Sequence, residues 1–267
     1  VRISNRELPP FWGAGSRFAI ASFLLFATAR VKGIALPRGK ALLGASIYGV
    51  LGFGASYAFA YWGLVQVQAG FASVIMSLVP LLTLLFAVIH GLESFRWRGL
   101  AGAMLSLSGI ALVFREQLHL AAPLLSLFAM VAAAISVAET NIVVKKFPKS
   151  HPVVTNAVAM AVGSAMLLTI SAVMNEPHII PTAFSTWVAF TYLVFIGSIA
   201  LFALFLFVLM RWTASATSYQ FVLSPLVTVP VAALLVYEKV SPVFALGAFL
   251  VLVGVYVGVL YSPKKKS

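Results

Sequence analysis

Nine long apolar runs divide the chain, and each is about as long as a membrane-spanning helix. Ala, Leu, Val, Phe and Gly dominate them, without the alternation of apolar and polar residues typical of membrane β-strands. A spanning helix needs about 20 apolar residues, and in lipid it must satisfy its own backbone hydrogen bonds. The pattern therefore predicts nine spanning α-helices. Their approximate bounds are 11–31, 41–63, 69–89, 97–114, 120–144, 152–174, 187–210, 213–236 and 240–261.

The composition excludes most soluble classes of protein. Of the 267 residues, 62% are hydrophobic and 9% are charged, whereas a soluble domain carries about 25% charged residues. We therefore expect an integral membrane protein rather than a soluble enzyme, a nucleic-acid-binding module or a disordered scaffold. The chain has no Cys, and its four His do not pair at helical spacing. Neither a disulfide, a metal site nor another cofactor is expected.

Basic residues gather in alternate loops. The chain has 18 Lys and Arg against six acidic residues, all of them Glu, for a net charge of +12. Most of the cations lie near residues 30–40, 96–98, 145–149, 211 and 264–266. Short cytoplasmic loops are enriched in Lys and Arg, which predicts a cytoplasmic C-terminus with Val1 on the outer side. The positive charge then encodes membrane topology, and nucleic acid is not an expected partner.

Two sets of residues recur at a constant offset of 145. Pro80, Glu93, Gly102 and Gly109 correspond to Pro225, Glu238, Gly247 and Gly254, with spacings of 13, 9 and 7 in both sets. The flanking segments also correspond: AGFAS at 69–73 with ASATS at 214–218, and LVPL at 78–81 with LSPL at 223–226. Such self-similarity indicates an internal repeat. We assign 1–115 to the first repeat and 116–267 to the second.

The charge pattern places Glu93 on the cytoplasmic side and Glu238 outside, so the repeats are expected to have opposite topology. That arrangement needs an odd number of helices in each repeat, but the first shows four and the second five. The sequence predicts an all-α polytopic membrane protein made of an inverted repeat of five-helix halves: ten helices when complete, nine in this chain, with the first one missing. A natural nine-helix protein is the alternative. Inverted repeats are common in secondary transporters, which open alternately to each side of a midplane site.

The repeated motif resembles the EamA-type members of the drug/metabolite transporter superfamily. The likeness rests on the stretch at 69–73 leading to Pro80, the Glu 13 residues later and the Gly-rich helix after it, all occurring twice. The opening R-E-L-P-P-F-W, with Arg17 seven residues after Pro10, is also similar to the family. Among its branches the chain is most similar to bacterial inner-membrane exporters of amino acids, including aromatic ones. The resemblance implies ten helices around a central cavity, partly lined by the first helix that is absent here.

Polar side chains inside the apolar runs are candidates for substrate contact, because polar groups in a bilayer are costly and usually face a cavity or the bundle interior. One stripe at helical spacing comprises Thr213, Thr217, Gln220, Ser224 and Thr228, and its repeat partner carries Ser73 and Ser77. From these stripes we predict that Ser73, Ser77, Thr217, Gln220 and Ser224 bind substrate. The alternative for the hydroxyl residues is helix packing. The amide of Gln220 is too large for that role.

Aromatic residues and prolines add four further candidates. Tyr57 and Tyr219 are predicted to bind substrate, because their rings suit aromatic or cationic solutes. Pro80 and Pro225 each remove a backbone donor from a helix interior, and we predict that both form hinges. A kink repaired by neighbouring helices is the alternative.

Two charged residues lie deep within the apolar runs, away from the run ends. Glu139 is about 9 Å inside the cytoplasmic end, level with Tyr219 and Gln220. We predict that it binds substrate, by taking a proton or a substrate ammonium; the alternative is a pair with Lys145 or its neighbour. Arg17 lies about 10 Å inside the opposite face. It can receive a substrate carboxylate or bond helix-end carbonyls, and we favour the structural role. A lone cation is a poor anchor for a phosphorylated substrate.

Small residues at Gly99 and Ala103, and at Gly254 and Gly258, predict close contact between two helices. A dimer through these faces is the alternative, and contact between runs 97–114 and 240–261 of one chain is favoured. We accordingly expect a monomer or a weak homodimer in the lipid bilayer.

These features together predict a secondary transporter. We expect it to export small metabolites across the bacterial inner membrane by alternating access. The expected substrates are amino acids, including the aromatic ones. The alternative is a multidrug or quaternary-cation exporter of the same superfamily that uses Glu139 as its cation partner. Motifs of serine hydrolases, zinc peptidases and dinucleotide-binding enzymes are missing from the sequence, so an enzyme is not expected.

Overall fold

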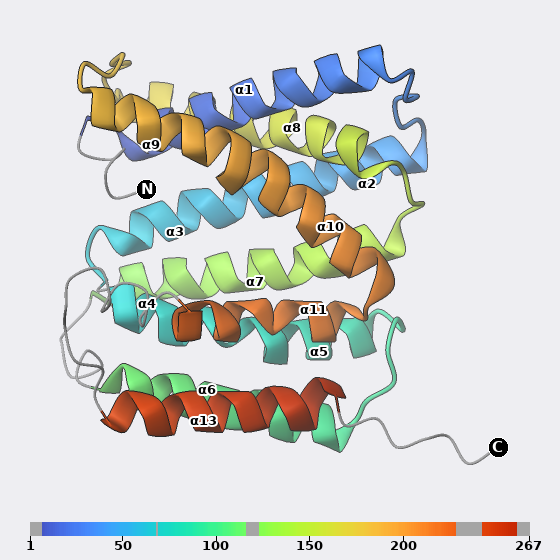
Figure 1. Ribbon diagram of the computed structural model, residues 1–267, viewed down its shortest axis with the longest axis vertical. Coiled ribbons are helices and arrows are strands. Elements are labelled where there is room, and N and C mark those ends of the chain that lie inside the picture. Colours follow the sequence, from blue (N-terminus) through green and yellow to red (C-terminus); the bar gives the residue numbers. More distant parts are fainter. Residues whose placement is uncertain (1–6, 68, 116–122, 228–241, 261–267) are drawn as a thin grey trace. The chain divides into compact units, whose positions relative to one another are not determined.

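The computed structural model describes residues 7–67, 69–115, 123–227 and 242–260, which form two compact units (Figure 1). Unit 1 comprises Val1–Tyr61 and Val143–Arg211, and unit 2 comprises Trp62–Ile142 and Trp212–Ser267. Each unit takes segments from both predicted repeats. The compact units therefore do not coincide with the repeats 1–115 and 116–267, which stay a prediction from the sequence.

The described residues are mostly helical, with no strand among them, and seven helices are long and apolar enough to cross a membrane. They are Pro10–Val31, Lys40–Leu64, Phe71–Ile89, Leu124–Lys146, Pro152–Val173, Phe184–Arg211 and Pro242–Val259. Trp97–Val113 is apolar but shorter. The helix in the predicted run 213–236 is described as far as residue 227, so Thr228 and Glu238 lie outside the described residues. The all-α polytopic fold is confirmed.

Unit 1 contains α1 (Pro10–Val31), α2 (Lys40–Tyr48), most of α3 (Ser56–Leu64), α8 (Pro152–Val173), α9 (Phe184–Val194) and α10 (Leu201–Arg211). Helix α1 packs along α8 (Figure 1). Two side-chain hydroxyls form hydrogen bonds between these helices: Ser22 donates to the Ala157 carbonyl at 2.8 Å, and Ser164 donates to the Gly15 carbonyl at 2.8 Å. Since residues early in α1 meet residues late in α8, the two helices are antiparallel. Buried hydroxyls of this kind hold helices together where lipid offers no partner.

Two π-helical turns interrupt the helices of unit 1, at Gly49–Ala55 between α2 and α3 and at Phe195–Ala200 between α9 and α10. The first turn packs against α8. Gly49 permits this approach, because a Cβ there would lie 2.5 Å from the Ala159 carbonyl oxygen. Turns of this kind inside helices are frequent at functional sites.

Unit 2 contains α4 (Ala69–Met76), α5 (Val79–Ile89), α6 (Trp97–Val113), most of α7 (Leu124–Lys146), α11 (Ala214–Ser218) and α13 (Pro242–Val255), followed by a π-helical turn at Tyr256–Leu260. Helices α6 and α13 lie side by side (Figure 1). A Cβ on Gly102 would lie 2.6 Å from the Gly254 carbonyl oxygen, and one on Gly109 would lie 2.7 Å from the Gly247 carbonyl oxygen. The predicted tight contact between these two runs is confirmed, but it is made at Gly102 and Gly109 and not at Gly99, where a Cβ would meet Leu84 of α5.

The two glycine contacts between α6 and α13 are equivalent under the offset of 145. The offset relates Gly102 to Gly247 and Gly109 to Gly254, so the contact of Gly102 with Gly254 corresponds to that of Gly247 with Gly109. The order of the contacts also makes the two helices antiparallel. Repeat-related helices thus pack on each other within unit 2.

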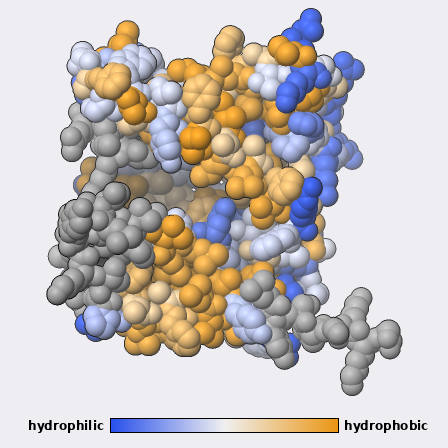
Figure 2. All heavy atoms as spheres, in the orientation of Figure 1, coloured by the Kyte–Doolittle hydropathy of each residue, from blue (hydrophilic) through white to orange (hydrophobic). Residues whose placement is uncertain are grey.

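Large apolar side chains are exposed on both units. In unit 1 they include Phe184 (83% exposed) and Leu204, and in unit 2 Phe249 (62%) and Leu252. Figure 2 shows hydrophobic side chains over much of the visible face of each unit. Surfaces of this kind suit lipid and not water. Together with the seven candidate spans, they make the chain a multi-pass membrane protein.

Candidate functional site

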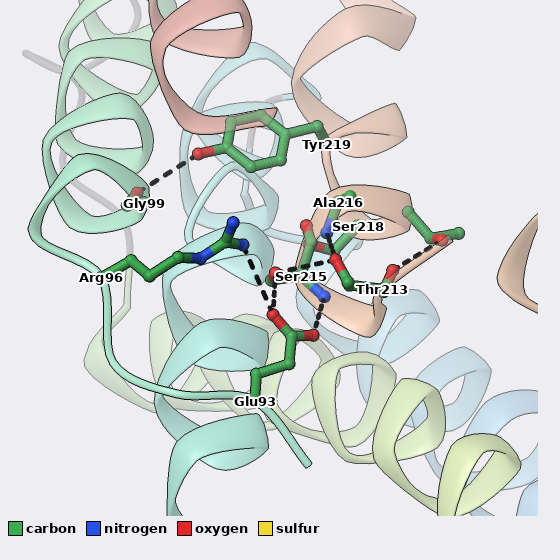
Figure 3. A network of polar contacts seen from close by, with 9 residues as sticks. Glu93, Arg96, Gly99, Thr213, Ser215, Ala216, Ser218 and Tyr219 are labelled. Carbon is green, nitrogen blue, oxygen red and sulfur yellow. Dashed lines mark hydrogen bonds and ion pairs between the residues drawn. The ribbon is translucent and has the colours of Figure 1, made fainter. Parts of the chain in front are cut away.

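Glu93 organises a polar network in unit 2 (Figure 3). It lies in the loop after α5, with its side chain 9% exposed. Its carboxylate accepts hydrogen bonds from the Ser215 amide at 3.0 Å and from the Ser215 hydroxyl, and Arg96 Nη2 lies 3.8 Å away. Ser215 is in the first turn of α11, where free backbone N–H groups favour a negative charge. The network therefore fixes the start of α11 to the loop after α5.

Tyr219 occupies a structural position beside this network. It is 4% exposed, and its hydroxyl donates to the Gly99 carbonyl of α6 at 3.3 Å (Figure 3). Its hydroxyl and ring also fill the space left by the missing side chain of Gly258. Substrate contact by Tyr219 stays a prediction, with its one hydroxyl hydrogen already donated to α6.

The predicted polar stripe is not one continuous helix face. Helix α11 ends at Ser218, Tyr219 is a turn residue, and helix resumes at residue 220. Thr217 is buried, whereas Gln220 and Ser224 are exposed. The expectation of a single face is therefore wrong, because helical spacing holds only while the helix is unbroken. Whether these residues bind substrate stays a prediction.

Two of the predicted hydroxyls are bound to their own helices. Thr217 donates to the Thr213 carbonyl at 2.9 Å, and Ser77 donates to the Val74 carbonyl at 2.6 Å. Both are buried; Ser77 lies in the turn between α4 and α5, and Ser73, within α4, is half-buried. A hydroxyl bonded in this way keeps a lone pair for a ligand but has no hydrogen left to donate.

The helix around Pro80 is interrupted, which suits the predicted hinge. Helix α4 ends at Met76 and α5 begins at Val79, so Pro80 lies in the first turn of α5, where its missing N–H costs nothing. In the second repeat the interruption is at Tyr219, six residues before Pro225. Motion at either proline stays a prediction.

Glu139 pairs with a histidine. Its Oε1 atom lies 3.4 Å from Nε2 of His90 at the end of α5, and both side chains are 28% exposed. The Nδ1 atom of His90 is 3.0 Å from the Phe86 carbonyl oxygen. If Nδ1 donates to that carbonyl, the contact with Glu139 requires a second proton, on Nε2 or on the carboxyl group. The pair can therefore hold a proton.

Asn141 is a buried polar residue that the sequence reasoning missed. Its Nδ2 donates to the Thr83 hydroxyl at 3.3 Å, and both residues are fully buried in unit 2. Its Oδ1 has no hydrogen-bond partner within the described ranges. The rule that singled out Glu139, a polar group inside an apolar run, also applies to Asn141. In the same ranges no three His or Glu side chains gather as a metal site would require.

Tyr57 is the one predicted site residue in unit 1, and it belongs to an aromatic cluster. Its ring stands edge-on to Phe18 at 4.9 Å, and Phe18 stands edge-on to Phe53 at 4.9 Å. Phe53 in turn contacts Phe202 at 4.5 Å. The guanidinium of Arg17 lies 5.5 Å from the centre of the Tyr57 ring. An aromatic cluster, with Phe18 and Phe53 fully buried, thus lies beside a buried cation within one unit.

The EamA-like transporter family model matches residues 1–115 and 124–260. The chain belongs to the EamA-like transporter family. Membership confirms the resemblance found in the sequence and makes the protein a membrane transporter.

The relatives of this EamA-family chain include bacterial transporters. It is 27% identical to the "Uncharacterized inner membrane transporter YedA" of Escherichia coli K12, over 86% of this chain and 74% of that protein. It is also 27% identical to a "Probable amino-acid metabolite efflux pump" of the same organism, over 97% of this chain and 88% of that one. A "Probable terminal-alkyne amino-acid exporter" of Streptantibioticus cattleyicolor is 32% identical over 37% of this chain and 33% of that protein.

A solved crystal structure shares the fold. It aligns with a TM-score of 0.81 at 19% sequence identity, covering 96% of this chain and 90% of that chain.

Proposed function

We propose that this EamA-family transporter exports small metabolites, namely amino acids that include the aromatic ones, across the bacterial inner membrane by alternating access. The observation that carries the proposal is the match, over 97% of the chain, to a relative named as a probable amino-acid metabolite efflux pump. A second relative, also named as an amino-acid exporter, matches 37% of the chain. In this proposal the protein is a transporter and not an enzyme. The distribution of Lys and Arg places its C-terminus in the cytoplasm.

The chemistry of unit 1 supports this substrate class. Amino acids are zwitterions at neutral pH, and aromatic ones also present a flat apolar ring. Tyr57 and Phe202, the half-buried members of the cluster, have rings suited to stacking, and Arg17 has a positive charge beside Tyr57. The unit thus contains groups that complement both parts of such a solute.

Export of quaternary cations is the second candidate, favoured by the position of Glu139. This carboxylate lies within a spanning helix and is 28% exposed. A carboxylate at this position can attract a cation. A transporter of this kind would depend on Glu139 for every substrate.

Efflux from proteoliposomes separates the two candidates. Vesicles that contain the protein are loaded in turn with labelled aromatic, aliphatic and basic amino acids and with a quaternary cation. We expect saturable amino-acid efflux that survives Glu139→Gln, with Glu7→Gln as a matched control outside the spanning segments. Cation efflux alone, abolished by Glu139→Gln and not by Glu7→Gln, would overturn the amino-acid proposal.

A further inference from the structure

Arg17 is a buried charge without the hydrogen bonds that such a charge requires. It lies in α1, is 4% exposed, and is the only charged residue among the buried residues of the described chain. In those same residues neither its Nε nor its Nη2 atom has a hydrogen-bond partner. A guanidinium stays protonated in proteins and carries five N–H donors. A structural role for Arg17 predicts hydrogen bonds from its guanidinium to carbonyl groups at a helix end. Within the described residues, Nε and Nη2 form no such bond.

The rings around Arg17 stabilise its charge but do not replace the missing acceptors. Its guanidinium carbon lies 4.5 Å from the centre of the Phe18 ring and 5.5 Å from that of Tyr57. Such cation–π contacts act on the face of the guanidinium. The N–H groups point outward in its plane, where they form hydrogen bonds. The N–H donors at Nε and Nη2 of the guanidinium are therefore available to a ligand.

The described acids of unit 1 are already engaged elsewhere. Glu7 accepts the Ala183 amide at the start of α9, at 3.2 Å, and Glu176 accepts the Trp12 amide at the start of α1, at 2.8 Å. Both carboxylates thus serve helix N-termini, as the helix dipole favours. The described part of unit 1 leaves no carboxylate for Arg17.

The missing partner has a definite chemistry. A planar fork of N–H donors matches a carboxylate or a phosphate, which it binds with two parallel hydrogen bonds. A single buried cation balances the one negative charge of a carboxylate better than the two of a phosphate monoester. The neighbouring rings favour a solute with an apolar or aromatic part.

We propose that the Arg17 guanidinium binds the carboxylate of the exported amino acid, with the Tyr57 ring beside it. This inference rests on the proposed function and names the group that recognises one end of the substrate. Arg17 then selects for solutes with a free carboxylate, and the aromatic cluster contacts the rest of the solute.

Competition within proteoliposomes tests this role. Vesicles with the wild-type protein are loaded with labelled phenylalanine and with either unlabelled phenylalanine or phenylalaninamide, which has no carboxylate. We expect phenylalanine to compete about tenfold better or more, the range expected from losing a hydrogen bond to a charged group. Arg17→Gln should remove this preference, and Arg17→Lys should retain part of it because the charge remains without the fork.

Arg30→Gln is the matched control, since Arg30 is exposed near the end of the same helix. It should keep the wild-type preference. Gel filtration and thermal unfolding of each variant in detergent establish that it folds. If Arg17→Gln does not fold, the wild-type comparison still decides, because equal competition by the two compounds contradicts a carboxylate-binding group.

The outcomes separate this inference from the function on which it rests. A variant Arg17→Gln that keeps the preference, or that weakens both competitors equally, overturns the role of Arg17 and leaves amino-acid export intact. A wild-type protein that transports no amino acid overturns the proposed function, and the inference with it.

Discussion

The Glu93 network of unit 2 and the buried Arg17 of unit 1 differ in how far their hydrogen bonds are completed. In unit 2 the carboxylate of Glu93 meets both donors of Ser215, with Arg96 nearby, and the Tyr219 hydroxyl is bound to Gly99. In unit 1 the guanidinium of Arg17 is buried with two nitrogens that the described residues do not satisfy. A completed network fixes a structure, whereas an incomplete one leaves donors for a ligand. Binding is therefore best sought where the bonding is incomplete.

The packing of the two units differs as well. In unit 2 the helices α6 and α13 meet backbone to backbone at glycines such as Gly102 and Gly254. In unit 1 large rings, among them Phe18, Phe53 and Phe202, fill the space between helices. The contact between α6 and α13 is accordingly sensitive to an added methyl group, and the ring cluster of unit 1 to a lost ring.

The largest effect is expected from Gly102→Ala in unit 2. The new methyl group would lie 2.6 Å from backbone atoms of Gly254 and Gly258, which cannot move without separating α6 from α13. We expect the free energy of unfolding to fall by about 3 kcal/mol, the upper end for overpacking. Thermal unfolding in detergent measures it. Ala101→Val, on the exposed face of the same helix, is the control. Equal stability of the two variants would show that the glycine contact is not tight.

A smaller loss is expected from Glu93→Gln. The substitution removes the negative charge that faces the Ser215 amide and hydroxyl, and we expect a loss of about 2 kcal/mol, typical of a hydrogen bond to a charged group. The same unfolding assay applies. Arg96→Gln should cost less than about 1 kcal/mol, because Arg96 is 45% exposed and 3.8 Å from the carboxylate. If Arg96→Gln costs more than Glu93→Gln, the network depends on the ion pair and not on the helix start.

The smallest effect concerns Glu7, in the loop before α1. Hydrogen bonds from the hydroxyls of Thr186 and Thr182, and from the Ala183 amide, hold the pKa of Glu7 below its ordinary value of 4.5. A lowered pKa in the folded state stabilises the fold above pH 4.5, and this stabilisation is lost as the pH falls through the folded-state pKa. Glu7→Gln should therefore weaken the acid dependence of the unfolding temperature below pH 4.5. An unchanged acid profile would mean that Glu7 does not hold the start of α9.

Much of the fold could be predicted from local pattern. The apolar runs near 11–31 and 152–174 became α1 and α8 within a residue or two, because any apolar run in lipid must bond its own backbone. The small residues of run 97–114 also predicted its packing on run 240–261. The polar stripe failed at Tyr219, since spacing along the sequence does not show where a helix is interrupted.

The candidate site was less predictable. All the candidates were found by the same signal, a polar side chain inside an apolar run. In the structure Thr217 bonds to a carbonyl one turn earlier and Glu139 contacts His90, whereas Arg17 lacks acceptors for two nitrogens. The sequence contains the same kind of residue in all three cases. Only neighbours distant in the chain distinguish a satisfied group from one that is still available.

The sequence by itself determined the class of this protein and most of its spanning helices, and it predicts an internal repeat. These follow from composition and spacing, which act within one helix or between equivalent residues. The tertiary structure decided how segments of both repeats combine in each unit, and which polar groups find partners. Glu93 and Ser215 are 122 residues apart. A hydrogen bond depends on distance and direction in space, and the order of residues along the chain does not contain either.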